Sequence, residues 1–337
     1  MAELKKTRPQ NKVGDFFVDT SCIDCGTCYW MAPDTFIHKE GQSAVFHQPN
    51  SSNEKSSALR ALYSCPTFSI GHTKKSSLDK EVEASFPFPI GDPRDSIYLT
   101  GVHAENSFGA TSYFIERKGK EGPKNILIDS PRFFSKMAKK LCERGGAYYQ
   151  FLTHRDDIAD TDKYFEAFSA QNEPKRIIHQ EDATKDSLKS YEIILTGNEP
   201  YQLDSETLII PVPGHTRGSC VLLYKNKYLF TGDHLAYSTK LQQLVAFKRA
   251  CWYDFTIQIE SMKKLLDFSF SYVLPGHGAP FESTPENMKK ELEKLAAEME
   301  AVAIQMKLDY ENNPSEMSGS VVVFHENSEL LEEEDNG

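Results

Sequence analysis

The sequence contains no apolar run of the roughly 18 residues that a membrane-spanning helix needs, so a transmembrane protein is excluded. Its opening stretch, MAELKKTRPQNKVGD, has basic residues with no apolar segment behind them, so no secretory signal peptide is expected. On these two absences we expect the chain to be cytoplasmic. Thiols stay reduced in that compartment, so disulfides are not expected either.

An excess of positive charge is absent as well. The formal net charge is −11, and residues 308–337 hold nine acidic side chains and no Lys or Arg, which leaves −2 for the remainder. A nearly neutral body gives no reason to expect nucleic acid or a membrane surface as a partner. Residues 309–337 are predicted to be an acidic, disordered tail.

The composition indicates a globular protein with two domains, because 39% of the 337 residues are hydrophobic and 26% are charged. Between Gly71 and Asp95, three prolines, two glycines and the lack of an apolar period indicate a linker or an irregular crossing. We therefore predict a small domain at 1–72, a linker at 73–95, and a second domain with a C-terminal helix at 96–308.

The segment after the predicted linker alternates short β-branched or aromatic runs with helical stretches, which indicates a layered α/β fold. The strand-like runs are SIYLTGV, TSYFIER, NILIDSP, YYQFLTH, KRIIHQ, ETLIIPVPG, SCVLLYK, KYLFTGD and SYVLPGHG. The helical stretches include RFFSKMAKKLCERG and DKYFEAFSAQ. A last helix is predicted to begin at Pro285, with Thr284 as its cap, and to pack through an apolar stripe. The stripe comprises Met288, Leu292, Leu295, Met299, Val302 and Met306.

Four cysteines of the small domain have the spacing of iron–sulfur ligands. Cys22, Cys25 and Cys28 form C-x2-C-x2-C, and Cys65 is followed by Pro66. Each two-residue gap lets the loop curl round one corner of a cluster, and a fourth cysteine from a distant segment closes it. A zinc site or buried thiols are the alternatives, but zinc ribbons have two C-x2-C knuckles. We predict one 4Fe-4S cluster on these four residues.

This stretch, from Phe16 to His72, resembles a single-cluster bacterial-type ferredoxin domain. The other cysteines, Cys142, Cys220 and Cys251, lie in apolar surroundings and are predicted to be small buried side chains.

The second domain has four patches in which His or Asp follows a strand-like run: FLTHRDDIAD, PVPGHTRGS, LFTGDHLAY and VLPGHGAPF. Strand ends are rigid, so they can assemble a metal site, and imidazole and carboxylate ligands suit zinc or iron. The candidate ligands are His154, Asp156, His215, Asp233 and His277. Three further histidines are expected to make structural hydrogen bonds rather than to bind metal; these are His103, His179 and His234.

Together the patches resemble the metallo-β-lactamase superfamily from about Ser96 to Phe281, nearest to its glyoxalase II and persulfide dioxygenase branch. The resemblance implies an αββα sandwich, preceded here by the small α+β ferredoxin-like domain. It also implies a structural role for Asp129 in ILIDSP. His215 of GHTRGS and His277 of PGHG would be metal ligands, and Asp233 of TGDH would be the ligand that bridges two metals.

One motif departs from that superfamily, which has T-H-x-H-x-D-H where this chain has Thr153 to Ala159, THRDDIA. Asp156 replaces the second His, and the last two ligands would fall on Ile158 and Ala159 or, with an insertion, on Asp160 and Thr161. One zinc or iron ion has a set of four ligands in His154, Asp156, His215 and Asp233. A second metal has an incomplete set, limited to Asp233, His277 and either Asp157 or Asp160.

Three functional hypotheses follow. The first is a metal-dependent hydrolase of a small ester or thioester, in which Asp233 orients the metal and Asp156 or Asp157 positions water or accepts its proton. The second is an iron-dependent oxidoreductase that exchanges electrons with the cluster and with a redox partner protein. The third is a catalytically inactive sensor or scaffold, in which the cluster also staples a small domain.

Overall fold

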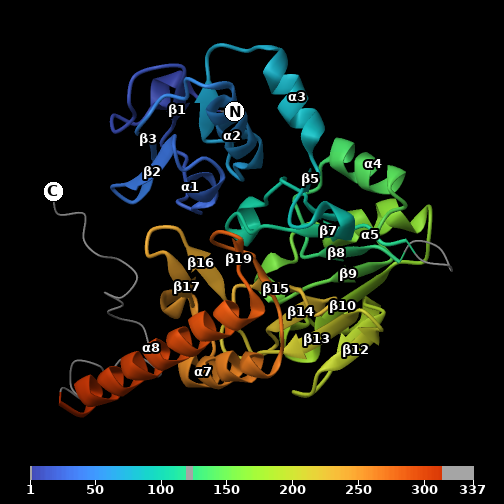
Figure 1. Ribbon diagram of the computed structural model, residues 1–337. Coiled ribbons are helices and arrows are strands. Elements are labelled where there is room, and N and C mark those ends of the chain that lie inside the picture. The colour runs from blue at the N-terminus through green and yellow to red at the C-terminus, as the bar shows by residue number, and fades with distance from the viewer. Residues whose placement is uncertain (1, 119–123, 313–337) are drawn as a thin grey trace. The chain divides into compact units, whose positions relative to one another are not determined.

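The computed structural model describes residues 2–118 and 124–312 (Figure 1). The chain forms two compact units. Unit 1 consists of Met1–Phe151 and Asp156–Arg176, and unit 2 consists of Leu152–Arg155 and Ile177–Gly337. The domain limits predicted from the sequence stay a prediction. Of the predicted acidic tail, residues 313–337 lie outside the described residues, and residues 309–312 belong to the last helix.

The first part of unit 1 consists of short strands and two helices. Its elements are β1 (Phe16–Val18), α1 (Thr27–Met31), β2 (Phe36–Lys39), β3 (Gln42–Val45), α2 (Ser52–Ser64) and β4 (Ile70–His72). β1 pairs with β4 and β2 pairs with β3, both antiparallel. A capping box starts α2, in which Ser51 accepts from the Glu54 backbone N–H and Glu54 accepts from that of Ser51. In this α+β arrangement α1 begins two residues after Cys25 and contains Cys28.

The predicted linker at 73–95 contains regular secondary structure that the sequence did not predict. It contains α3 (Ser77–Ser85) and the short strand β5 (Phe88–Pro89), and α3 connects the first elements of unit 1 to β5 (Figure 1). Asp79 caps α3 by accepting from the backbone N–H of Ser76, and its other oxygen lies 2.6 Å from His72 Nε2. The helix is specified by this cap and not by an apolar period, which is why the period alone missed it.

The rest of unit 1 builds a sheet with helices beside it. Its elements are β6 (Ile97–Leu99), β7 (Tyr113–Ile115), β8 (Ile126–Ile128), α4 (Ser135–Glu143), β9 (Tyr149–Phe151) and α5 (Thr161–Ser169). The strand order is β9-β8-β7-β6-β5, with β8 and β9 parallel and the other pairs antiparallel. Each strand and helix coincides with a run predicted from the sequence, except β5.

Unit 2 contains a six-stranded sheet in the order β12-β13-β14-β15-β18-β19. Its strands are β12 (Tyr201–Asp204), β13 (Thr207–Pro211), β14 (Cys220–Tyr224), β15 (Tyr228–Gly232), β18 (Tyr272–Pro275) and β19 (Phe281–Glu282). The other elements are β10 (Lys175–His179), whose first two residues belong to unit 1, and α6 (Ser187–Ser190), β11 (Ile193–Leu195), β16 (Ala236–Ser238), β17 (Gln243–Val245), α7 (Phe255–Lys264) and α8 (Pro285–Asn312). The sheet is antiparallel except between β15 and β18, which run parallel. The predicted mixed α/β class is therefore confirmed.

One face of this sheet packs against α7 and α8, which lie side by side (Figure 1). Val221 and Leu223 alternate along β14, so both project to the same face and join the core with Met262 of α7. Helix α8 begins at Pro285, as predicted, and the Thr284 hydroxyl accepts from the N–H of Asn287 at 3.3 Å. From the predicted stripe, Met288, Leu292, Leu295 and Met299 are buried in that core.

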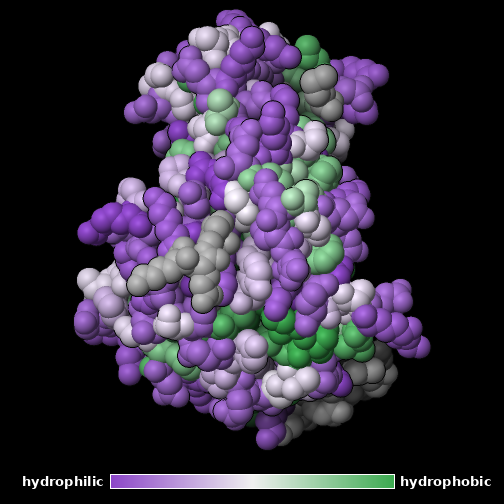
Figure 2. Space-filling view, turned by 90° about the vertical axis from the view of Figure 1, so that its right-hand side faces the viewer, coloured by the Kyte–Doolittle hydropathy of each residue, from purple (hydrophilic) through white to green (hydrophobic). Residues whose placement is uncertain are grey.

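The exterior is mostly polar on the face shown in Figure 2, with hydrophobic side chains gathered in limited patches. Among the described residues, no helix has both the length and the apolar character that a membrane span requires. Cys220 and Cys251 are buried as predicted, whereas Cys142 is only partly buried, which corrects the expectation for that residue. Its thiol contacts the Ala167 carbonyl at 3.5 Å.

Candidate metal centre and cluster site

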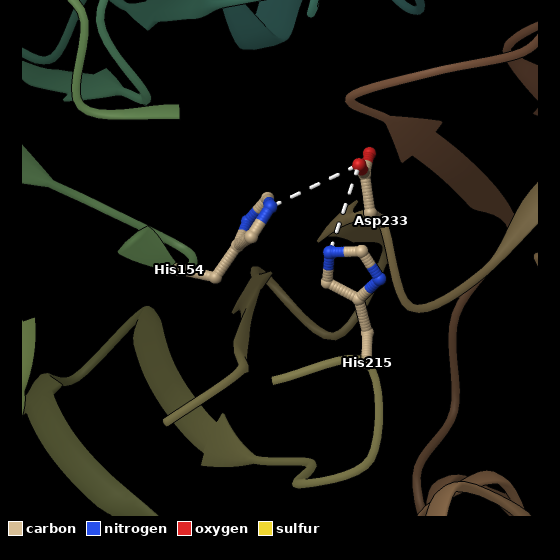
Figure 3. A group of neighbouring side chains, drawn as sticks. All are labelled: His154, His215 and Asp233. Carbon is tan, nitrogen blue, oxygen red and sulfur yellow. Dashed lines mark ion pairs between the residues drawn. The ribbon is translucent and has the colours of Figure 1, made fainter. Parts of the chain in front are cut away.

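Three predicted ligands converge in unit 2. One ligand atom from each of His154, His215 and Asp233 lies within 4.8 Å of the other two, and all three side chains are at least nine-tenths buried (Figure 3). Asp233 Oδ2 is 3.8 Å from His154 Nε2 and 3.9 Å from His215 Nε2. Figure 3 shows both imidazoles directed at this carboxylate.

The donor set fits a single metal ion. Zinc lies about 2.1 Å from nitrogen and oxygen ligands in a tetrahedron, so two ligand atoms are about 3.4 Å apart. The observed separations of 3.8 and 3.9 Å are close to that value. Two imidazoles and one carboxylate are also a common donor set for catalytic zinc and for non-haem iron. Among the described residues, this is the only group of three or more His, Cys, Asp or Glu whose ligand atoms all lie within 4.8 Å of one another.

Strand ends position the three ligands, as the sequence predicted. His154 follows β9, His215 lies between β13 and β14, and Asp233 comes directly after β15. Gly232 allows the segment that carries His154 to lie close to the segment that carries Asp233. Its φ is +49°, and a Cβ there would lie 2.4 Å from Thr153 Oγ1. A side chain at position 232 would therefore displace His154 from Asp233.

The orientation of His154 is fixed by its neighbour. His154 Nδ1 lies 2.9 Å from Thr153 Oγ1, and the Thr153 carbonyl accepts from the Cys220 backbone N–H at 2.8 Å. A hydrogen bond at Nδ1 directs Nε2 towards Asp233, which is how ligating histidines are usually held.

His277 contacts the site through Asp233 and is not part of the three-residue group. Its Nδ1 lies 2.7 Å from Asp233 Oδ1, so an Nδ1–H donates to the carboxylate and the ring lone pair is on Nε2. Burial alone would raise the pKa of Asp233, but His277, His154 and His215 together hold it below its usual range. The carboxylate is therefore ionised and can serve as a metal ligand.

The predicted roles of Asp156 and Asp157 stay predictions, because both residues belong to unit 1. Asp160 is engaged elsewhere, since its carboxylate accepts from the Phe133 backbone N–H at 2.6 Å and binds Lys163 at 2.8 Å. Asp129, also in unit 1, is buried at the end of β8 with a φ of +54°.

The histidines expected to be structural have different surroundings. His179 Nε2 lies 2.9 Å from the Gly197 carbonyl, and its Nδ1 accepts from the Glu181 N–H at 3.3 Å, as predicted. The expected structural hydrogen bond of His234 is not observed, because the residue is buried and within the described part of the chain neither ring nitrogen has a hydrogen-bond partner. Burial, followed by the charge of His215, lowers the pKa of His234 to about 3. His234 is therefore neutral at physiological pH, and it is not in the ligand group.

Sequence reasoning missed Asp182, which connects the loops that carry two ligands. It is buried, and its carboxylate accepts from the backbone N–H of Arg155 at 3.1 Å and of Gly218 at 2.9 Å, and from the Thr216 hydroxyl. Arg155 follows His154 and Thr216 follows His215, so one side chain fixes both loops. No motif surrounds Asp182 in QEDAT, so the sequence offered no signal for this role.

We expect Asp182→Asn to lower the metal affinity of the His154–His215–Asp233 site by roughly 10- to 100-fold, as is usual for residues that orient ligands. The amide has one accepting oxygen instead of two, so at least one loop loses its anchor. Competition with a chromogenic chelator measures the change. Asp186→Asn, an exposed carboxylate four residues on, is the matched control and should leave affinity unchanged. Equal affinities for the two variants would contradict this role.

The four predicted cluster cysteines line one cavity in unit 1. Backbone N–H groups point at their sulfurs: Ser69 donates to Cys65 Sγ at 3.2 Å, and Ser43 donates to Cys22 Sγ at 3.4 Å. Burial raises the pKa of Cys25 to about 11 and that of Cys28 well above its usual value. Four sulfurs around one cavity with N–H donors fit a cluster, whose binding would release the thiol protons.

A comparison with known families concerns the segment that contains the four cysteines. Residues 18–72 match the 4Fe-4S single cluster domain of Ferredoxin I. The ferredoxin-like prediction is thus confirmed for this segment, and it contains all four cysteines. No curated protein matches the chain.

Solved structures similar to the chain include metallo-β-lactamase superfamily proteins. One from Sulfolobus tokodaii has 18% identity and a TM-score of 0.40, and covers 59% of this chain and 85% of its own. ETHE1 from Myxococcus xanthus has 15% identity and a TM-score of 0.44, with 60% and 84% covered. A metallo-β-lactamase family protein from Thermus thermophilus has 15% identity and a TM-score of 0.43, with 63% and 81% covered.

Proposed function

We propose that this chain is a metal-dependent hydrolase of a small ester or thioester that also carries a 4Fe-4S cluster. The observation that carries the proposal is the convergence of His154, His215 and Asp233 in a buried group with metal-ligand spacing. A bound zinc or iron ion would polarise a carbonyl and make water more acidic. A catalytically inactive domain would have no need to bring these three side chains together. Their convergence therefore argues against the sensor or scaffold hypothesis.

Each residue of the site has a different role in the proposed reaction. His154 and His215 present Nε2 atoms as neutral ligands, and Asp233 supplies one negative charge through Oδ2. Through Oδ1 the same carboxylate holds the Nδ1–H form of His277, whose Nε2 lone pair can bind metal or accept a proton. Asp156 and Asp157 remain candidates for positioning water.

An aromatic and cationic edge beside His215 favours an anionic substrate. The backbone N–H groups of Trp252 and Tyr253 donate to the His215 carbonyl at 2.8 and 3.1 Å. Trp252 is 46% exposed with its ring 6.2 Å from that of His215, and the Arg217 guanidinium lies 4.7 Å over the Tyr253 ring. An exposed indole and a guanidinium suit a substrate that carries a carboxylate or phosphate group.

A second candidate is an iron-dependent oxidoreductase, which the match to a ferredoxin domain favours. Hydrolysis needs no electrons, whereas a ferredoxin cluster moves them one at a time. Two imidazoles and a carboxylate are also the ligands of many iron oxygenases. In this case the chain would exchange electrons with a redox partner protein.

Metal analysis joined to an activity assay tests the proposal. We expect anaerobically purified protein to contain about one zinc or iron beyond one cluster, and to hydrolyse an acidic thioester faster than its neutral analogue. Removal of that metal should abolish hydrolysis, and its return should restore it. Iron at the site with no hydrolysis would favour the oxidoreductase. No turnover with the site loaded, and no change on metal removal, would overturn the enzyme proposal.

A further inference from the structure

A chain of hydrogen bonds leads from a cluster cysteine to a residue outside the matched ferredoxin segment. The Cys25 thiol lies 3.5 Å from Thr27 Oγ1, and Thr27 Oγ1 lies 3.2 Å from His103 Nδ1. His103 is 76 residues further along the chain, in the segment between β6 and β7. Thr27 is 4% exposed and His103 is fully buried, so water does not compete for these contacts.

The segment that carries His103 also covers Cys25 with its backbone. A Cβ on Gly109 would lie 2.8 Å from Cys25 Cβ and 2.9 Å from Cys25 Sγ, so any larger residue would collide with the cysteine. The φ of Gly109 is +87°, which also favours glycine. The side of the cluster site at Cys25 is therefore completed by residues 103–109, beyond the 18–72 segment that matches a ferredoxin domain.

The direction of the hydrogen bonds follows from what each atom can donate. A cysteine that ligates iron is a thiolate, which only accepts, so the Thr27 hydroxyl would donate its one proton to Cys25 Sγ. Thr27 Oγ1 then has lone pairs left, and His103 Nδ1–H donates to them. The Gly109 carbonyl, 3.4 Å from Thr27 Oγ1, competes for the same hydroxyl proton. The contact with His103 fixes the hydroxyl between these two acceptors.

We propose that Thr27 tunes the reduction potential of the cluster by donating to the Cys25 sulfur, and that His103 is the positioning residue for that donor. The inference rests on the proposed cluster. Hydrogen bonds to cluster sulfurs are one of the determinants of the potential, because they stabilise the more negative, reduced form. Since His103 lies outside the ferredoxin segment, the potential depends on how residues 101–109 fold.

Substitutions at position 27 test the donor. Thr27→Val has nearly the same shape without the hydroxyl, and we expect it to shift the midpoint potential to a more negative value. Thr27→Ser retains the hydroxyl and should stay close to the native potential. The readout is a dithionite titration of the full chain with redox mediators, followed by EPR of the reduced cluster.

Substitutions at position 103 test the positioning role. His103→Leu should lower the midpoint potential, whereas His103→Asn, which keeps a side-chain N–H near the place of Nδ1, should restore most of it. Because His103 acts through Thr27, adding His103→Leu to Thr27→Val should cause no further shift. Ser112→Ala is the matched control, because the Ser112 hydroxyl bonds to Thr100 (2.6 Å) beside this segment and does not line the cavity of the four cysteines. It should leave the potential unchanged.

The outcomes separate this inference from the proposed cluster. If native protein holds no iron and sulfide, the cluster proposal itself fails. If native protein and Thr27→Val hold equal iron and sulfide and the same midpoint potential, Thr27 is not a donor and the inference is overturned. Equal shifts from His103→Leu in the native and the Thr27→Val backgrounds would overturn the positioning role, since a purely structural effect does not depend on the hydroxyl.

Discussion

Replacing Cys65 with serine is expected to remove the 4Fe-4S cluster and to abolish the EPR signal that appears after dithionite reduction. Cys65 ends α2, is 8% exposed, and lines the same cavity as Cys22, Cys25 and Cys28. In two-cluster ferredoxins a cysteine before proline serves the other cluster, but this chain has a single C-x2-C-x2-C run. We therefore expect Cys65 to be the fourth ligand of one cluster, and a serine hydroxyl is a much poorer ligand for iron than a thiolate.

Iron and sulfide analysis with EPR measures this loss on the intact chain. Cys142→Ser is the matched control, because Cys142 is partly buried and contacts the Ala167 carbonyl, not the cluster cavity. The control should keep native iron content. If Cys65→Ser kept four irons, four sulfides and the reduced signal, the assignment of the fourth ligand would be wrong.

Replacing Asp233 with asparagine should cost the second site its metal and all measurable hydrolysis. Asparagine keeps the shape but removes the negative charge that faces His154 and His215 at 3.8 and 3.9 Å. It also replaces a strong acceptor for His277 Nδ1, 2.7 Å away. Residues that only orient a ligand change metal affinity by roughly 10- to 100-fold. Loss of a ligand together with its charge should therefore lower metal affinity by more than about 100-fold.

The measurement is metal content after dialysis, together with the dissociation constant for added zinc. Asp267→Asn, at an exposed position of unit 2, is the control and should retain metal and activity. The four cysteines of the proposed cluster lie in unit 1, so both variants should keep native sulfide content. A variant at Asp233 that bound zinc as tightly as the native protein would show that the three-residue group is not the metal site.

The sequence could predict most strands, the four cysteines that line one cavity, and the three side chains that meet in unit 2, because the signal for each is local. A strand-like run followed by GHT or GD marks a strand end, and the spacing of Cys22, Cys25 and Cys28 is read directly. The signal for the start of α8 is also local, because the capping residue Thr284 and the first helical residue Pro285 are adjacent.

The parts that could not be predicted depend on contacts between distant residues. Asp182 joins two loops through single hydrogen bonds, with no pattern in the residues around it. The partner of Thr27 is 76 residues away, so no window of sequence contains both. Helix α3 was missed because a cap specifies it within a stretch that lacks an apolar period. Cys142 was predicted to be buried because its neighbours are apolar, but it lies near the edge of its helix's buried face.

The two sites differ in when they can first exist during synthesis. Three of the four proposed cluster ligands lie between Cys22 and Cys28, so we expect iron to reach three thiolates as soon as this short stretch has been translated. The candidate ligands of the second site, His154, His215 and Asp233, follow different strands. These side chains lie near one another only after the sheet of unit 2 has formed. We therefore expect cluster loading to begin on the nascent chain, and the second metal to bind only the folded product, which it would stabilise by mass action.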